Sequence, residues 1–180
     1  ALGINENLPI KAISRAIQKF KGTQRRFEKF TEIGGVQLYD DYAHHPTEIN
    51  VTLQGAKESL NAPITCIFQP HRYSRTKELL HSFPNSFDYA DTIIITDIYA
   101  AHEPKNNAIS ANTIVDMLKE KGKNAYFIPD KDAIPTFIQG HIKHHSNVII
   151  TMGAGDISAI LPKIAQELKK SPHKLDPPSS

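Results

Sequence analysis

The sequence predicts an α/β protein with a Rossmann-like, mostly parallel sheet of about six strands and helices on both faces. Short apolar runs rich in β-branched residues recur along the chain, namely "ITCIF", "TIIIT", "NAYFI" and "NVIIT". Unbroken apolar runs of this length indicate strands buried on both faces, as in a parallel sheet. Segments with helical periodicity separate the runs, and strand–helix alternation is typical of a parallel sheet covered by helices.

The chain begins with a predicted helix followed by two predicted strands. Apolar residues three and four positions apart over Leu8–Phe20 indicate one helix face, and Gly22 is a plausible end for that helix. The stretch "RRFEKFTEIGGVQLYDDY" then predicts two short strands around the Gly34-Gly35 turn.

Helical patterns lie between the remaining strands. Pro46 and Pro70 stand where helices would begin, in keeping with the tolerance of proline in a first turn. The tail from residue 171 to 180 has the proline and serine content of a disordered end. The predicted helices are Thr47–Leu60, Tyr73–Phe83, Ser110–Lys121, Asp130–Gly140 and Asp156–Lys169.

Composition limits the class of protein. A chain of 180 residues with 39% apolar and 22% charged residues suits one soluble globular domain. The net charge of +2 is too small to indicate a nucleic-acid or membrane-surface partner. No stretch approaches the ~20 apolar residues of a membrane span, and the start has no signal-peptide pattern, so a cytoplasmic location is expected. The chain lacks an initiator Met, from which we expect a piece of a longer protein.

Polar and aromatic residues concentrate where the predicted strands end. In an open α/β sheet, ligands bind beyond the carboxyl ends of the strands. We therefore expect one edge of the sheet to gather the chemistry of this protein. The segments that leave the strand ends are "DDYAHHP", "QPHRYSRT", "TDIYAAHEPK", "PDKDA" and "MGAGDI".

The stretch "LYDDYAHHPTEI" is compatible with a metal site, an acid–base pair or a ligand cradle. Adjacent histidines such as His44 and His45 point about 100° apart on a helix, which makes a shared metal unfavourable. A proton-transfer role would need a raised pKa, which a sequence does not show. The position at a strand end favours a cradle, with one of Asp40 and Asp41 as a cap and the other reaching the ligand.

The stretch "QPHRYSRTKELL" predicts an anion site. Arg72 and Arg75, three residues apart, would lie on one helix face and converge on a single carboxylate or phosphate. The free N–H groups of the helix start would attract the same anion, and His71 would add a third donor. The alternative is a solvated helix start held by salt bridges.

Two further motifs are less specific. "MGAGDI" lacks the third glycine of a dinucleotide fingerprint, since Ser158 stands there, and a tight strand-to-helix turn with Asp156 near the helix start is favoured. Arg25 and Arg26 form either a surface basic pair or an arginine placed at a domain junction for phosphate charge. Cys66 is expected to be a small buried residue.

Taken together, "DDYAHHPTEI", "FQPHRYSRTKEL", "DIYAAHEP" and "GAGDI" resemble the C-terminal domain of the Mur ligases, the ATP-dependent enzymes that build the peptidoglycan stem peptide. The similarity extends from Gly22 to about Leu168 and is greatest to the alanine-adding member. It implies that residues 1–22 end a central ATPase domain and that residues 23–170 form the C-terminal domain. His102 stands where arginine or glycine is more usual, so that loop is given no role beyond lining the rim.

The resemblance also implies roles for individual residues. Arg26 would be a catalytic residue that approaches the ATP phosphates. The adenine and ribose would be surrounded by Asp41, Tyr42 and His44. The carboxylate of the incoming amino acid would be held by His71, Arg72 and Arg75.

The implied reaction has two steps: ATP phosphorylates the carboxylate of UDP-N-acetylmuramate, and the amine of L-alanine then forms the amide. The chain has no G-x-x-x-x-G-K-[ST] loop. The resemblance places that loop, the Mg²⁺ ligands and the UDP-sugar site in the preceding domains, so the fragment alone is expected to be inactive and to hold no metal. Alternatives are a ligase that joins a recycled tripeptide to the same sugar nucleotide, a non-enzymatic nucleotide- or anion-binding module and, more distantly, a metal hydrolase.

Overall fold

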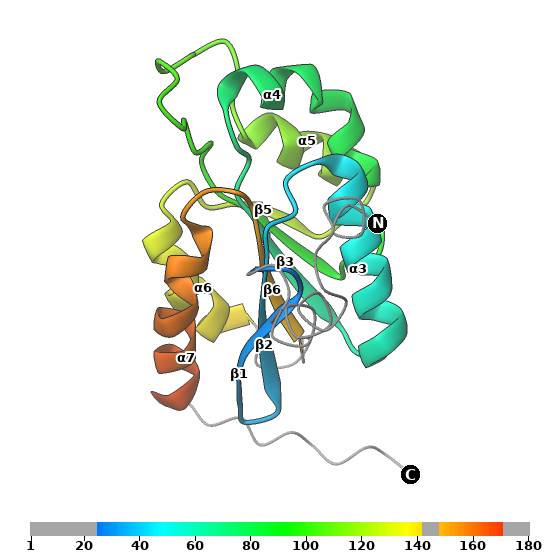
Figure 1. Ribbon diagram of the computed structural model, residues 1–180, viewed down its shortest axis with the longest axis vertical. Coiled ribbons are helices and arrows are strands. Elements are labelled where there is room, and N and C mark those ends of the chain that lie inside the picture. The colour runs from blue at the N-terminus through cyan, green and yellow to red at the C-terminus, as the bar shows by residue number, and fades with distance from the viewer. Residues whose placement is uncertain (1–24, 142–147, 171–180) are drawn as a thin grey trace, which may run out of the picture.

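The computed structural model describes residues 25–141 and 148–170, which form a six-stranded sheet with helices on both faces (Figure 1). The strand order is β1-β2-β6-β3-β4-β5. The β1–β2 pair is antiparallel, and all the other pairs are parallel. The predicted fold class is therefore confirmed.

The strands lie close to the positions that the apolar runs predict. They are β1 (Glu28–Ile33), β2 (Val36–Asp41), β3 (Ile64–Phe68), β4 (Thr92–Ile95), β5 (Ala125–Phe127) and β6 (Val148–Met152). The α-helices are α3 (Pro46–Leu60), α4 (Tyr73–Glu78), α5 (Asn112–Glu120), α6 (Ile134–His141) and α7 (Leu161–Lys170). Short 3₁₀ helices are η1 (Leu80–Asn85), η2 (Lys131–Ala133) and η4 (Ile157–Ile160).

The central strands are buried on both faces because each face has its own apolar layer. All residues of β3 and β6 are buried, and neighbouring residues of one strand point into opposite layers. Cys66 thus packs in the layer with α3, η1 and α5, whereas Ile67 packs in the layer with α6 and α7. This double burial explains why the strand sequences are apolar without alternation.

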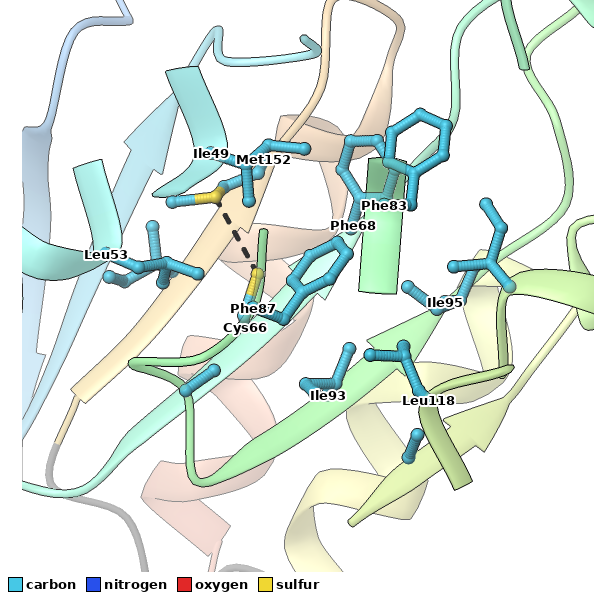
Figure 2. Close-up of a cluster of buried hydrophobic side chains, with 14 of the residues drawn as sticks. Ile49, Leu53, Cys66, Phe68, Phe83, Phe87, Ile93, Ile95, Leu118 and Met152 are labelled. Atoms are coloured by element: carbon cyan, nitrogen blue, oxygen red, sulfur yellow. Dashed lines mark hydrogen bonds between the residues drawn. The ribbon is translucent and has the colours of Figure 1, made fainter. Parts of the chain in front are cut away.

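Aromatic and sulfur-containing side chains fill the first layer. The ring of Phe68 lies 5.4 Å from that of Phe83 and 5.5 Å from that of Phe87 (Figure 2). The sulfur atoms of Cys66 and Met152 are 3.7 Å apart in the same cluster. Burial raises the pKa of the Cys66 thiol far above its ordinary value, so the expected role of this residue as a small buried group is confirmed.

Prolines account for most of the differences between the predicted and observed helices. The predicted helix Tyr73–Phe83 is instead α4 followed by η1, and η1 contains Pro84, which cannot donate a helical hydrogen bond. Two other predicted helices each begin as a 3₁₀ turn before the α-helix. Pro135 and Pro162 are the second residues of those α-helices, a position that proline tolerates.

The start of α3 matches its prediction closely, with Pro46 in the first turn. His45 precedes it and accepts a hydrogen bond from the Thr47 backbone N–H through Nδ1, at 3.2 Å. The Glu48 carboxylate accepts the backbone N–H groups of His44 and His45 in return. A capping box of this kind satisfies N–H groups that a helix leaves free.

The predicted helix Leu8–Phe20 and the predicted disordered tail lie outside the described residues, and the division into domains stays a prediction. Across 25–141 and 148–170, no helix has the length and apolar character that crossing a membrane requires.

The Phe87 side chain offers a test of the packing in the first layer. Its exposed fraction is 0%, so we expect Phe87→Ala to lower the free energy of unfolding by about 3–5 kcal/mol through a lost transfer energy and a residual cavity. Urea unfolding followed by circular dichroism measures this change. Tyr89, two residues on and 37% exposed, is the matched control, and Tyr89→Ala should cost less than about 1 kcal/mol. Equal losses for the two variants would contradict the packing described here.

Candidate functional site

The carboxyl ends of the parallel strands meet at one edge of the sheet, which we call the rim. The register pairs Asp41 with Met152 and Met152 with Phe68, so β2, β6 and β3 end side by side. An isolated bridge between His71 and Tyr99 joins the loops that follow β3 and β4. An ion pair brings the segment after β5 to the loop after β6. The predicted convergence of the five segments is confirmed.

Arg25 joins the end of β2 to the loop after β6 through its side chain. Its Nε donates to the Asp40 carboxylate at 2.6 Å, and its two terminal nitrogens donate to the backbone carbonyls of Gly155 (3.1 Å) and Gly153 (2.7 Å). The Arg25 carbonyl accepts the Tyr42 N–H at 2.7 Å, and the guanidinium carbon lies 5.4 Å from the centre of the Tyr42 ring. A planar guanidinium with fixed donors suits this multiple attachment.

The neighbouring Arg26 has a different environment. Arg25 and Phe27 both have positive φ angles, of 59° and 45°, and the side chain between them is exposed. The predicted role of Arg26 at the ATP phosphates stays a prediction.

The two acids that end β2 are both bound inside the protein. Asp40 pairs with Arg25 and accepts the Thr151 hydroxyl at 2.8 Å. Asp41 is 3% exposed, and its two oxygens accept the backbone N–H groups of Phe27 and Ala43, each at 2.7 Å. Burial raises the pKa of the Asp41 carboxyl above its ordinary value, although the two N–H donors oppose the shift. Neither acid caps α3, because the His45 ring occupies that position.

The loop after β2 presents two aromatic rings to the rim. Tyr42 is 38% exposed, and its ring meets that of His44 edge to face at 5.4 Å. His44 Nδ1 lies 3.1 Å from the Tyr42 carbonyl oxygen and 3.6 Å from the Glu48 carboxylate. The predicted nucleotide residues Tyr42 and His44 are therefore adjacent, with the buried carboxylate of Asp41 behind them.

Further ring contacts connect His44 to His71, the first residue of the predicted amino-acid site. His44 and His71 have ring centroids 6.0 Å apart, and His71 stacks on Tyr99 at 5.6 Å with an interplanar angle of 17°. The Nδ1 of His71 is buried and has no hydrogen-bond partner among the described residues. Burial and the nearby charge of Arg75 lower the pKa of His71, which favours the neutral ring.

Arg72 lies outside the helix in which the sequence placed it. Its backbone has φ 70°, a conformation that favours glycine, and α4 begins one residue later. The Arg72 N–H donates to the Tyr99 carbonyl at 2.8 Å, and the Arg72 carbonyl accepts the Thr76 N–H at 3.0 Å. The prediction that Arg72 and Arg75 share a helix face is therefore wrong, although both remain at the start of α4, with Arg72 exposed and Arg75 half-buried.

An internal carboxylate occupies the start of α4. Glu103 accepts the Ser74 backbone N–H at 3.0 Å through one oxygen and the Ser74 hydroxyl through the other. The hydrogen bonds from Ser74 lower the pKa of Glu103 below its ordinary value. The Ser74 N–H, one of the helix N–H groups that the sequence assigned to a ligand, is thus taken, and the predicted anion site stays a prediction.

The loop after β6 is a close-packed turn, as predicted. Asp156 accepts hydrogen bonds from Gln69 Nε2 at 2.9 Å and from Lys131 Nζ at 2.6 Å, and its side chain does not cap η4. Burial pushes the pKa of Asp156 upward, but these two donors outweigh it and the pKa lies below its ordinary value. A Cβ on Gly155 would lie 2.4 Å from the Gln69 amide oxygen and 2.7 Å from Tyr99, so this position needs glycine.

Several residues that shape the rim were given no role by the sequence reasoning. Gln69, Tyr99 and Glu103 are the main examples, and each makes its contact with a segment far away in the chain. A polar residue directly after a buried strand was the only available signal for Gln69. Within the described part of the chain, no three or more His, Cys, Asp or Glu side chains gather in a way that could hold a metal ion.

Comparisons with known proteins identify relatives of this chain. The family described as "Mur ligase, glutamate ligase domain" matches residues 25–155. The UDP-N-acetylmuramate–L-alanine ligase of Caldanaerobacter subterraneus is 46% identical over 154 residues, which cover 86% of this chain and 33% of the relative. The ligase of the same name from Clostridium novyi is 41% identical over 151 residues, covering 84% and 33%. The chain thus spans about a third of the length of these relatives.

Solved structures agree with the sequence comparison. A UDP-N-acetylmuramate–alanine ligase from Thermotoga maritima superposes with a TM-score of 0.69 at 29% identity, covering 94% of this chain and 36% of that one. A murein peptide ligase from Psychrobacter arcticus has a TM-score of 0.67 at 21% identity, covering 86% and 32%, and shows a shared fold. With the family match extending from Arg25 into the turn after β6, this chain belongs to the Mur ligase family and contains its glutamate ligase domain.

Proposed function

We propose that the chain is the C-terminal domain of an ATP-dependent ligase that adds L-alanine to UDP-N-acetylmuramate in the cytoplasm, during peptidoglycan synthesis. The main support is its 46% and 41% identity to two ligases named for that reaction. The rim adds physical support, since it holds the rings of Tyr42, His44 and His71 in contact, directly before the arginines at the start of α4. Such a surface suits a base on one side and a carboxylate on the other.

The nucleotide half of the rim fits part of an ATP molecule. The exposed ring of Tyr42 and the adjacent His44 offer surfaces on which a base can stack. The exposed Arg26 would meet phosphate charge. Asp41, proposed for the same nucleotide half, is buried and already accepts two backbone N–H groups, so we assign it the support of this loop.

The amino-acid half of the rim fits a small carboxylate. Arg72 and Arg75 would bind it with charge-assisted hydrogen bonds, and His71 would act as a neutral neighbour because its pKa is lowered. Clamping the carboxylate leaves the amine of alanine free to point toward its reaction partner. Alignment of this kind can lower a bimolecular barrier substantially, which suits a site without an evident general base.

The chemistry proposed for the complete enzyme is phosphorylation of the muramoyl carboxylate by ATP with Mg²⁺, followed by displacement of phosphate by the alanine amine. The phosphate loop, the Mg²⁺ ligands and the UDP-sugar site belong, in this proposal, to preceding domains. Residues of this chain would orient the amino acid, stack the base and neutralise phosphate charge.

A recycling ligase that accepts a tripeptide is the second candidate. Its support is the fold shared with the murein peptide ligase of Psychrobacter arcticus, at 21% identity. A tripeptide needs space near Arg72 and Arg75, where a single amino acid would be clamped. Identity above 40% to the alanine-adding enzymes favours the first candidate.

ATP turnover tests the proposed function directly. Full-length protein incubated with UDP-N-acetylmuramate and ATP should release phosphate when L-alanine is added and should form the corresponding amide. The fragment of residues 1–180 serves as a control and should form no amide. Turnover that requires a tripeptide in place of alanine would favour the second candidate, and nucleotide binding without turnover would favour a non-enzymatic module.

Replacing Arg72 tests the carboxylate clamp. Loss of a charge-assisted hydrogen bond costs about 1.5–3 kcal/mol, so Arg72→Ala should raise the KM for alanine roughly 10- to 150-fold. Steady-state kinetics with alanine and ATP varied separately measure this. Lys77→Ala, which removes an exposed cation in α4, the helix that follows Arg72, is the matched control. An alanine KM that stays at the wild-type value in Arg72→Ala would remove the assigned role.

The pKa of His71 predicts a specific dependence of stability on pH. Because its pKa is lower in the folded protein than the ordinary value of about 6.5, the neutral ring favours folding above that pH, and this contribution is lost as the pH falls below it. The unfolding free energy of the wild type should therefore fall relative to that of His71→Asn between pH 7.5 and 5. Urea titrations at several pH values measure the difference. A wild type that gains stability relative to the variant on acidification would contradict the shift.

A further inference from the structure

The loop between β4 and α5 is hydrogen-bonded at two points to residues 70–74, the segment that follows β3 and begins α4. At the first point, the Tyr99 N–H donates to the Pro70 carbonyl and the Arg72 N–H donates to the Tyr99 carbonyl, both at 2.8 Å. At the second point, the Glu103 carboxylate binds the backbone and hydroxyl of Ser74. The first contact ends at the Arg72 N–H and the second begins at Ser74, so only Tyr73 lies between them.

A tight turn in this loop places Glu103 beside the start of α4. Ala101 and His102 have consecutive positive φ angles, of 48° and 72°, so the chain reverses direction between Tyr99 and Glu103. The Glu103 N–H donates to the Ala100 carbonyl at 3.0 Å and closes this turn. Two non-glycine residues in the left-handed region are uncommon, which indicates that the contacts of the loop hold them there.

Arg72 needs such support because its own backbone is unfavourable. A non-glycine residue at φ 70° is strained and persists only where the surrounding structure fixes it. Its N–H is held by Tyr99, and the helix that follows it is held by Glu103 through Ser74. Without the contacts of Glu103, the start of α4 would lose its attachment to the loop after β4, while the buried Thr76 would still hold the rest of this six-residue helix.

We propose that Glu103 is a positioning residue for amino-acid binding: through Ser74 it fixes the start of α4, so that Arg72 and Arg75 converge on one carboxylate. The inference rests on the proposed function. Glu103 also occupies the Ser74 N–H, so in this proposal the carboxylate of the amino acid is left to the arginine side chains. Glu103 itself need not touch the substrate.

Kinetics of the full-length enzyme test this role. Glu103→Ala and Ser74→Ala should each raise the KM for alanine, the former by about tenfold, the equivalent of about 1.4 kcal/mol of lost alignment. The kcat and the KM for ATP should change by less than about twofold, because the chemical step and the nucleotide half are not involved. Ser74→Ala removes only the hydroxyl bond and should have the smaller effect, and the double variant should resemble Glu103→Ala alone, because Glu103→Ala already removes both bonds.

The conservative variant and a matched control separate positioning from general damage. Glu103→Gln keeps an oxygen for the Ser74 N–H and an amide for the Ser74 hydroxyl, so its alanine KM should stay near the wild-type value. Glu32→Gln is the control, because Glu32 is an exposed acid that pairs with Lys29 beside the hairpin turn, at the opposite end of β2 from the rim. It should change no kinetic parameter.

Distinct results overturn the two proposals. A wild-type enzyme without alanine-dependent turnover would remove the proposed function. An active wild type with unchanged alanine KM in both Glu103→Ala and Ser74→Ala would remove the positioning role alone. A Glu103→Gln variant as impaired as Glu103→Ala would also overturn it, because the negative charge itself would then be required.

Discussion

The rim depends on the attachment of Arg25 to the ends of two neighbouring strands. One guanidinium binds the Asp40 carboxylate at the end of β2 and two backbone carbonyls after β6. A part-buried charge of this kind is tolerated only when its donors are satisfied, and here a carboxylate and two carbonyls satisfy them. The attachment holds the end of β2 against the loop after β6. It thereby helps to fix the positions of Tyr42 and His44, which follow β2, relative to that loop.

The contacts of the rim form a continuous chain from one half of the site to the other. Tyr42 contacts His44, His44 contacts His71, and His71 stacks on Tyr99, which also binds the Arg72 backbone. Ring contacts at these distances hold neighbouring side chains in defined orientations. Tyr42 and His44 of the nucleotide half are therefore packed continuously with His71 and the Arg72 backbone of the amino-acid half.

The fold and the convergence of the strand-end segments on the rim were predictable because they depend on short-range patterns. Apolar runs such as "ITCIF" and "NVIIT" have to be strands buried on both faces, and the carboxyl ends of such strands meet at one edge. The helix boundaries were less predictable where Pro84, Pro135 and Pro162 divide or delay a helix. The left-handed backbone of Arg72 gave no signal, because arginine rarely adopts that conformation.

The junction at Arg25 has a mechanical consequence. From Arg25 onward the backbone is bound into the rim, through the carbonyl of Arg25 to Tyr42 and through the N–H of Phe27 to Asp41. The Arg26 backbone is therefore tied on both sides to the segment that ends β2. The exposed side chain of Arg26 extends from this anchored backbone, so its rotamers, rather than movement of the main chain, set where its charge can reach.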